Sequence, residues 1–159
     1  MSLPWLDVAK KLIGTQEYAT GNNPAILQWA SLIGLDKTYT ADSIPWCGLT
    51  TAYIMAQSGF EPVKEPLWAL NWAKFGEQLS EPAYGCVIVY KRAAGGHVGL
   101  YLGEDANYYY TLGGNQSNQV CVKGEARSRA VAFRWPPDSD NLLVKGRVKT
   151  TLASAQANL

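Results

Sequence analysis

The chain has 159 residues, which is enough for one domain with a continuous core. Hydrophobic residues make up 47% and charged residues 17%, a composition typical of a folded chain rather than a disordered one. Lysine plus arginine number 14 against 13 aspartates and glutamates, with no basic run to neutralise phosphates, so nucleic acid is not an expected partner. No apolar run reaches membrane-spanning length and the first residues lack a signal-peptide pattern. We therefore expect a monomer made in the cytoplasm, without an integral membrane segment.

Helical patterns fill the front half of the chain and strand patterns fill the back half. This order predicts an α+β domain in which N-terminal helices pack on an antiparallel sheet. Helices are expected over residues 6–13, 23–34 and 46–58, with Gly59 as a left-handed residue after the third. A shorter helix is expected within residues 65–75, after a Glu-Pro pair.

Runs of β-branched and aromatic residues after Cys86 predict five strands. They are residues 87–90, 98–102, 108–112, 120–122 and 131–135. Short glycine-containing links between the first three predict an antiparallel meander. Two prolines end the last strand, so we place the domain at residues 1–137. Residues 138–159 are expected to form a partly ordered tail, frayed from Ala153 onward.

Cys47 falls in the first turn of the third expected helix, directly after Trp46. A helix N-terminus and a nearby imidazole both lower the pKa of a thiol, which makes it a better nucleophile. The alternative is that Cys47 is a small, inert core residue, as most buried cysteines are. Cys86 and Cys121 fall in or beside predicted strands, where we expect them to be buried and unreactive.

His97 is the only histidine, so it is the only candidate base for Cys47. It follows Gly95 and Gly96 at a predicted strand start, where the missing side chains would let the imidazole face an opening. A catalytic imidazole also needs a polar partner that fixes its tautomer. Asn115 is the first choice, because it ends the strand expected beside His97. Gln116 points the other way if that strand continues, so it ranks second.

Several of these features also have a purely structural interpretation. A lone histidine is commonly a surface or hydrogen-bonded core residue, and Gly-Gly-Asn is typical of a turn. Asp42 is expected to cap the helix of Cys47 rather than to bind a substrate amine. Glu17 lies in a loop that either lines a cleft or is solvated, and Trp46 is the candidate for a cleft wall. With Gln116, these residues are the candidates for substrate binding.

Metal chemistry is disfavoured because one histidine without clustered carboxylates makes a poor zinc site. We expect neither a metal nor another cofactor.

The segments that carry these candidates resemble the NlpC/P60 and CHAP superfamily, in particular a phage-associated branch of small CHAP-like proteins. The resemblance covers residues 3–136 and rests on the segments Asn23-Pro24, Ile44–Cys47, Gly96–Gly103, Leu112–Gln116 and Arg134–Pro136. It implies a papain-like fold with Cys47 as nucleophile, His97 as base and Asn115 as third member. CHAP enzymes often have a glutamate two positions before that asparagine, whereas this chain has Gly113.

Members of this superfamily cut amide bonds in peptidoglycan. The resemblance therefore implies a bacteriolytic cysteine peptidase or amidase of the endolysin kind. Such an enzyme is made in the host cytoplasm and acts on the cell wall, as an endopeptidase or an N-acetylmuramoyl-L-alanine amidase. Two alternatives remain open. One is a noncatalytic phage structural or wall-binding module, and the other is a toxin or effector amidase or acyltransferase on the same fold.

Overall fold

A computed structural model of the chain describes residues 2–159. Its helices are α1 (Pro4–Leu12), α2 (Pro24–Leu32), α3 (Cys47–Gln57) and α4 (Leu152–Ala157), with shorter 3-10 helices η1 (Ala69–Lys74), η2 (Arg127–Arg129) and η3 (Asp140–Leu142). Its strands are β1 (Glu77–Gln78), β2 (Val87–Arg92), β3 (Gly95–Glu104), β4 (Tyr108–Gln116), β5 (Gln119–Ala126) and β6 (Ala130–Trp135). The prediction of helices followed by strands is confirmed, and only the two-residue β1 was too short to show a strand pattern.

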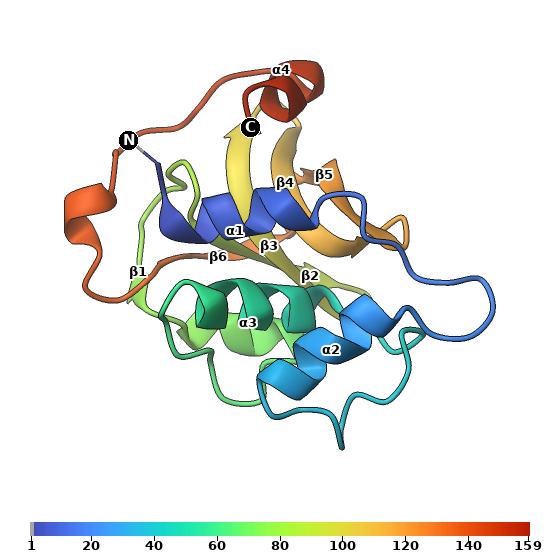
Figure 1. The fold of residues 1–159 in the computed structure, drawn as a ribbon. Coiled ribbons are helices and arrows are strands. Elements are labelled where there is room, and N and C mark those ends of the chain that lie inside the picture. The colour runs from blue at the N-terminus through green and yellow to red at the C-terminus, as the bar shows by residue number, and fades with distance from the viewer. Residues whose placement is uncertain (1) are drawn as a thin grey trace.

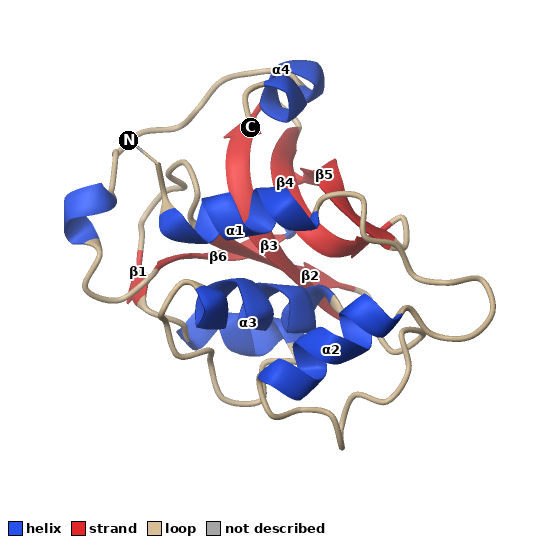
Figure 2. Cartoon of the chain, viewed as in Figure 1, coloured by secondary structure: helices blue, strands red, loops and turns tan. Residues whose placement is uncertain are grey.

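The six strands form one antiparallel sheet in the order β1-β6-β2-β3-β4-β5. The meander predicted for β2, β3 and β4 is confirmed, and β6 returns to lie between β1 and β2. Helices α1 and α3 lie in front of the curved sheet, with α2 beside α3 (Figure 1). Helix α3 packs against β3 and β4, and η1 packs against β2 and β3. Helix α3 therefore lies against the strand that carries His97 (Figure 2).

Local signals set the ends of the helices near the site. The Asn23 side chain accepts a hydrogen bond from the Ala25 N–H at 2.9 Å, and Pro24 opens α2. Gly59 follows α3 with a φ of 89°, and the next residue, Phe60, donates its N–H to the Met55 carbonyl at 2.9 Å. These contacts fix where α2 begins and where α3 ends, as the sequence predicted.

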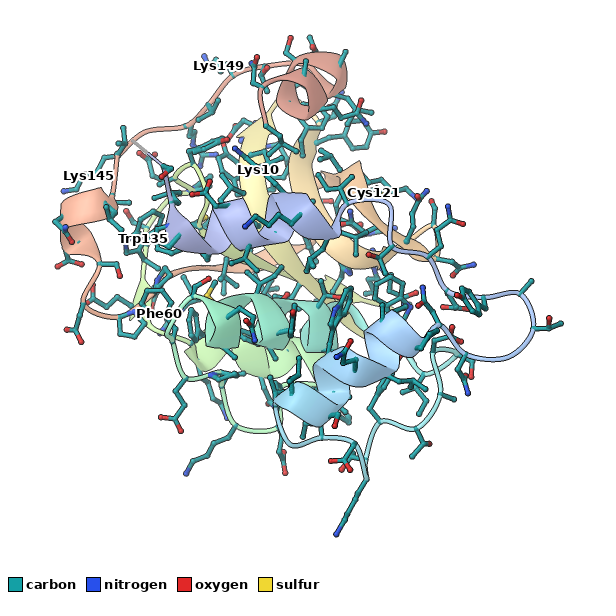
Figure 3. All side chains as sticks on the ribbon, viewed as in Figure 1. Lys10, Phe60, Cys121, Trp135, Lys145 and Lys149 are labelled. Atoms are coloured by element: carbon teal, nitrogen blue, oxygen red, sulfur yellow. The ribbon has the colours of Figure 1, made fainter. Side chains whose placement is uncertain are left out.

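A tryptophan cluster joins α1 to the sheet. The Trp5 ring meets Phe60 and Trp135 edge to face, at centroid distances of 5.7 and 5.1 Å. Phe60 and Trp135 are labelled in Figure 3, below and beside the start of α1. The Trp5 indole N–H donates to the Gly85 carbonyl at 2.7 Å, so its polar atom is satisfied inside the core.

Residues 138–159 are ordered, so the expectation of a tail frayed from Ala153 is wrong. Lys149, labelled in Figure 3, forms a parallel bridge with Glu104, and α4 packs on β5 with Ala155 buried. The segment also supplies a partner to the core, because the Ser139 carbonyl accepts the Trp135 indole N–H at 2.8 Å. The bridge to Glu104 and the packing of α4 on β5 join residues far apart along the chain, so composition alone does not predict them.

A buried carboxylate ties this segment to the sheet. Glu104 is 2% exposed and pairs with Arg127 at 2.9 Å and Arg147 at 3.1 Å. The Tyr101 hydroxyl also donates to it at 2.7 Å. Removing one partner of a buried carboxylate leaves part of its desolvation cost without compensation.

Arg147→Met should lower the free energy of unfolding by about 2 kcal/mol, because a charge-assisted partner of Glu104 is lost. Urea denaturation followed by circular dichroism measures this change. Lys145→Met, at an exposed position in the same segment, is the matched control and should have little effect. Equal effects of the two substitutions would show that the Glu104 contact does not anchor the C-terminal segment.

Candidate active site

Cys47 is the first residue of α3, as predicted. The first intrahelical backbone bond runs from the Thr50 N–H to the Trp46 carbonyl at 3.0 Å, so the N–H groups before Thr50 have no partner within the helix. No side chain caps this helix start. The N–H groups of Val98 and Gly48 both act on the thiol and favour its ionised form. The structure therefore places the thiol at an uncapped helix N-terminus, against the backbone of the residue that follows His97.

Asp42 does not cap α3, so that expectation is wrong. Its Oδ2 atom instead accepts the N–H groups of Tyr18 at 2.9 Å and Asn23 at 2.7 Å, and its own N–H donates to the Asn22 side chain at 3.1 Å. Asp42 is 2% exposed. It fastens the loop between α1 and α2, and this role leaves the N-terminal amides of α3 free.

The imidazole of His97 is held by Gln116 rather than by Asn115. The His97 Nε2 atom lies 2.8 Å from the Gln116 Oε1 atom. The Gln116 Nε2 atom donates to two carbonyls, those of Thr111 at 3.0 Å and Cys121 at 2.6 Å. Because both contacts require the NH₂ end of the amide, Oε1 must face the imidazole and accept its Nε2–H. Neutral His97 therefore keeps Nδ1 unprotonated, as a general base needs.

A bulge in β4 explains why the first choice of partner was wrong. Gly113 pairs with Cys121 and Gln116 pairs with Gln119, so β4 contains one more residue than β5 between these pairs. Asn115 has a left-handed φ of 57°. The extra residue turns Gln116 to the face that Asn115 would occupy in a regular strand. The Gln116 amide oxygen lies over Gly113, 3.2 Å from where a Cβ would be.

Tyr90 and Thr111 also help to position His97 and Gln116. Tyr90, paired with His97 across β2 and β3, stacks on the imidazole at a centroid distance of 6.1 Å. Its hydroxyl bonds to the Thr111 side chain at 2.6 Å. The Thr111 carbonyl in turn holds Gln116. Stacking and hydrogen bonding therefore position both the ring and its partner.

Burial keeps both candidate catalytic groups neutral. His97 is 1% exposed, and desolvation lowers its pKa to about 4, although the hydrogen bond that its Nε2–H donates to Gln116 acts in the opposite direction. Cys47 is 6% exposed, and desolvation raises its pKa above the ordinary value despite the N–H groups of Val98 and Gly48. The expectation of a low thiol pKa and of an imidazole facing an opening is wrong for this structure. At neutral pH the pair is a thiol and an imidazole, not an ion pair.

Cys47 lies in the wall of a groove of about 280 Å³. Pro45, Cys47, Leu67, Trp68, Ala69 and residues 94–96 line it. One wall is the segment that leads into η1, and the other is the turn between β2 and β3. Trp68 falls within the short helix expected over residues 65–75, and the sequence carries no signal that it lines a groove. Its exposure on the groove wall depends on how that segment folds against β3.

The predicted cleft residue Trp46 is fully buried and does not line this groove, so that expectation is wrong. Its ring packs near Trp29 at a centroid distance of 6.2 Å, and its indole N–H donates to the Glu17 carboxylate at 3.0 Å. Glu17 and Tyr18 do line a depression, a shallow one of about 630 Å³ formed by residues 14–20 with Asn23 and Ala25. This second surface adjoins the start of α3 through the contact between Glu17 and Trp46.

The other two thiols lie away from the groove. Cys86 is fully buried, and its pKa is raised to about 12 by desolvation. Cys121 is only partly buried, contrary to expectation, and its thiol lies 3.4 Å from the Gln116 carbonyl oxygen. Across residues 2–159 no three histidine, cysteine, aspartate or glutamate side chains gather in a way that would hold a metal ion.

Comparison with known proteins does not assign the chain to a family. No family model matches it, and no similar curated protein is found. In the described part of the chain, none of the helices has the length and apolar character needed to cross a membrane.

The neutral, buried imidazole makes stability depend on pH. The pKa of His97 is about 4 when folded and about 6.5 when unfolded, so protons bind preferentially to the unfolded chain between these values. The contribution is complete above pH 6.5 and is lost as the pH falls toward 4. We expect the free energy of unfolding to decrease by about 3 kcal/mol over this window because of His97.

Urea denaturation at pH 7, 5.5 and 4.5 measures this effect. His97→Asn should reduce the pH dependence, and carboxylates that titrate in both proteins cancel in the comparison. An unchanged dependence in the variant would contradict the assignment of a neutral, buried imidazole.

Proposed function

We propose that the chain is a cysteine peptidase or amidase of bacterial peptidoglycan, with a papain-like arrangement of its helices and sheet. The observation that carries the proposal is the fixed tautomer of His97, whose Nε2–H is held by Gln116 while the thiol of Cys47 lies beside the next residue of the strand. A nucleophile at a helix start, a base and an orienting amide are the parts that covalent acyl transfer needs. The resemblance to the NlpC/P60 and CHAP superfamily supplies the substrate class, including an endolysin-like role at the cell wall.

The mechanism follows from the neutral pair. His97 Nδ1 takes the thiol proton as Cys47 Sγ attacks the amide carbonyl carbon, and the backbone N–H of Cys47 donates to the developing oxyanion. The imidazolium then gives this proton to the leaving amine, and a thioester remains. Water activated by neutral His97 hydrolyses the thioester and restores the thiol. No hydrogen bond joins Cys47 Sγ to His97 in the described residues, so this mechanism requires the two side chains to approach each other when substrate binds.

The test is digestion of purified sacculi, followed by mass analysis of the released fragments. Wild-type protein should release soluble peptides or glycan strands by cutting amide bonds, and Cys47→Ala should reduce the rate roughly 10³-fold or more because the covalent step is lost. Cys86→Ala removes a different buried thiol, outside the groove, and should retain activity. Release by Cys47→Ala at the wild-type rate would end the proposal.

Gln116 and Asn115 are distinguished by a matched pair of variants. Gln116→Leu should lower kcat about 100-fold, because the imidazole loses the acceptor that fixes its tautomer. Asn115→Gly accepts the left-handed backbone and should keep activity close to that of the wild type. Circular dichroism confirms folding of each variant. If Asn115→Gly loses activity and Gln116→Leu does not, Asn115 is the third member as the family resemblance implies.

One observation favours a second candidate, a noncatalytic wall-binding or structural module. His97 is almost completely buried, and the residues that line the groove of Cys47 do not include it. On this alternative the imidazole is a satisfied core group. Binding of wild-type protein to sacculi without release of any fragment would support the module over the enzyme.

A further inference from the structure

Trp68 differs from the other tryptophans of the chain. Its side chain is 65% exposed, whereas the other five are at most 5% exposed. Four of those five donate their indole N–H to a carbonyl or carboxylate of the chain, namely Trp5, Trp46, Trp72 and Trp135. An indole is amphipathic, and exposed indoles are enriched where a protein binds a ligand or a partner. Its position on the wall of the Cys47 groove makes Trp68 part of the candidate active site.

The segment that carries this indole is held in place. The Trp72 indole donates to the Pro66 carbonyl at 2.9 Å, and the Asn71 side chain donates to the Glu65 carbonyl at 3.0 Å. The Pro66 carbonyl also lies directly over Gly48, where any side chain would collide with it. Because these contacts order the segment before a ligand arrives, binding to Trp68 has a small entropic cost.

Among residues 2–159, no charged side chain lines the groove. Apart from the thiol, its lining consists of proline, leucine, tryptophan, alanine and glycine. The depression on the loop between α1 and α2 contains the carboxylate of Glu17, and the two surfaces share no residue. A ligand in the Cys47 groove therefore meets an uncharged aromatic wall, and the carboxylate of Glu17 belongs to the other surface. In peptidoglycan, the uncharged and ring-shaped part is the glycan, while the stem peptide carries the charges.

We propose that Trp68 binds an N-acetylated sugar of the glycan strand, so that the bond cut is the amide between the lactyl group of muramic acid and the first stem residue. This inference rests on the proposed function and names the substrate for it. The C–H face of the sugar ring packs on the indole, and the indole N–H faces the hydroxyl and acetamido oxygens. Cys47 Sγ forms the thioester with the lactyl carbonyl, the C–N bond breaks, and the amine of the first stem residue leaves with the proton from His97. Water then releases the lactyl carboxylate.

Binding is measured with the Cys47→Ala protein, which holds substrate without cutting it. We titrate a disaccharide-pentapeptide and the same pentapeptide without sugars, and follow the heat of binding. The sugar-bearing ligand should bind about tenfold more tightly, and Trp68→Ala in the same background should remove most of this difference. Tyr108→Ala, at another exposed aromatic residue, is the matched control and should leave it unchanged. Equal affinity for the two ligands, or a difference that survives Trp68→Ala, overturns the inference.

Product analysis separates this inference from the proposed function. Digestion of sacculi by the wild-type protein should create a new amino group on the first stem residue and glycan strands without peptides. Fragments whose peptides all remain joined to muramic acid would overturn the sugar assignment alone, because an endopeptidase leaves that bond intact. No release of fragments would overturn the proposed function itself.

Discussion

The hydrogen bond between His97 and Gln116 is the constraint on which the candidate site depends. It exists because two backbone carbonyls hold the NH₂ end of the Gln116 amide and turn its oxygen to the imidazole. The bulge in β4 brings Gln116 to that face, and the missing side chain of Gly113 leaves room for the amide. A change in any of these parts would free the ring to rotate or to exchange tautomers. The sheet thus determines which imidazole nitrogen is available for chemistry.

Helix α3 contributes the complementary half of the site. Since Asp42 fastens a loop instead of capping this helix, the backbone N–H groups at its start remain available to the thiol and to a developing oxyanion. Burial nevertheless outweighs these donors and raises the pKa of Cys47, while it lowers that of His97. The mechanism proposed above therefore uses proton transfer during the attack rather than a thiolate formed in advance.

Local patterns predicted much of the fold, whereas the site depended on contacts that such patterns do not contain. The cap at Asn23, the left-handed Gly59 and the position of Cys47 follow from short segments, and the structure confirms them. The choice of Asn115 over Gln116 assumed strict strand alternation, which the bulge breaks. Burial of His97 and order after residue 137 also required knowledge of distant partners.

The resting state of Cys47 has a consequence for the lifetime of the protein. Peroxide and other oxidants attack thiolates, and a buried, protonated thiol reacts with them slowly. A thiol that stays protonated at rest keeps its nucleophilic sulfur in the presence of oxygen for longer than a resting thiolate would. The raised pKa of Cys47 would in this way preserve the protein between encounters with its target.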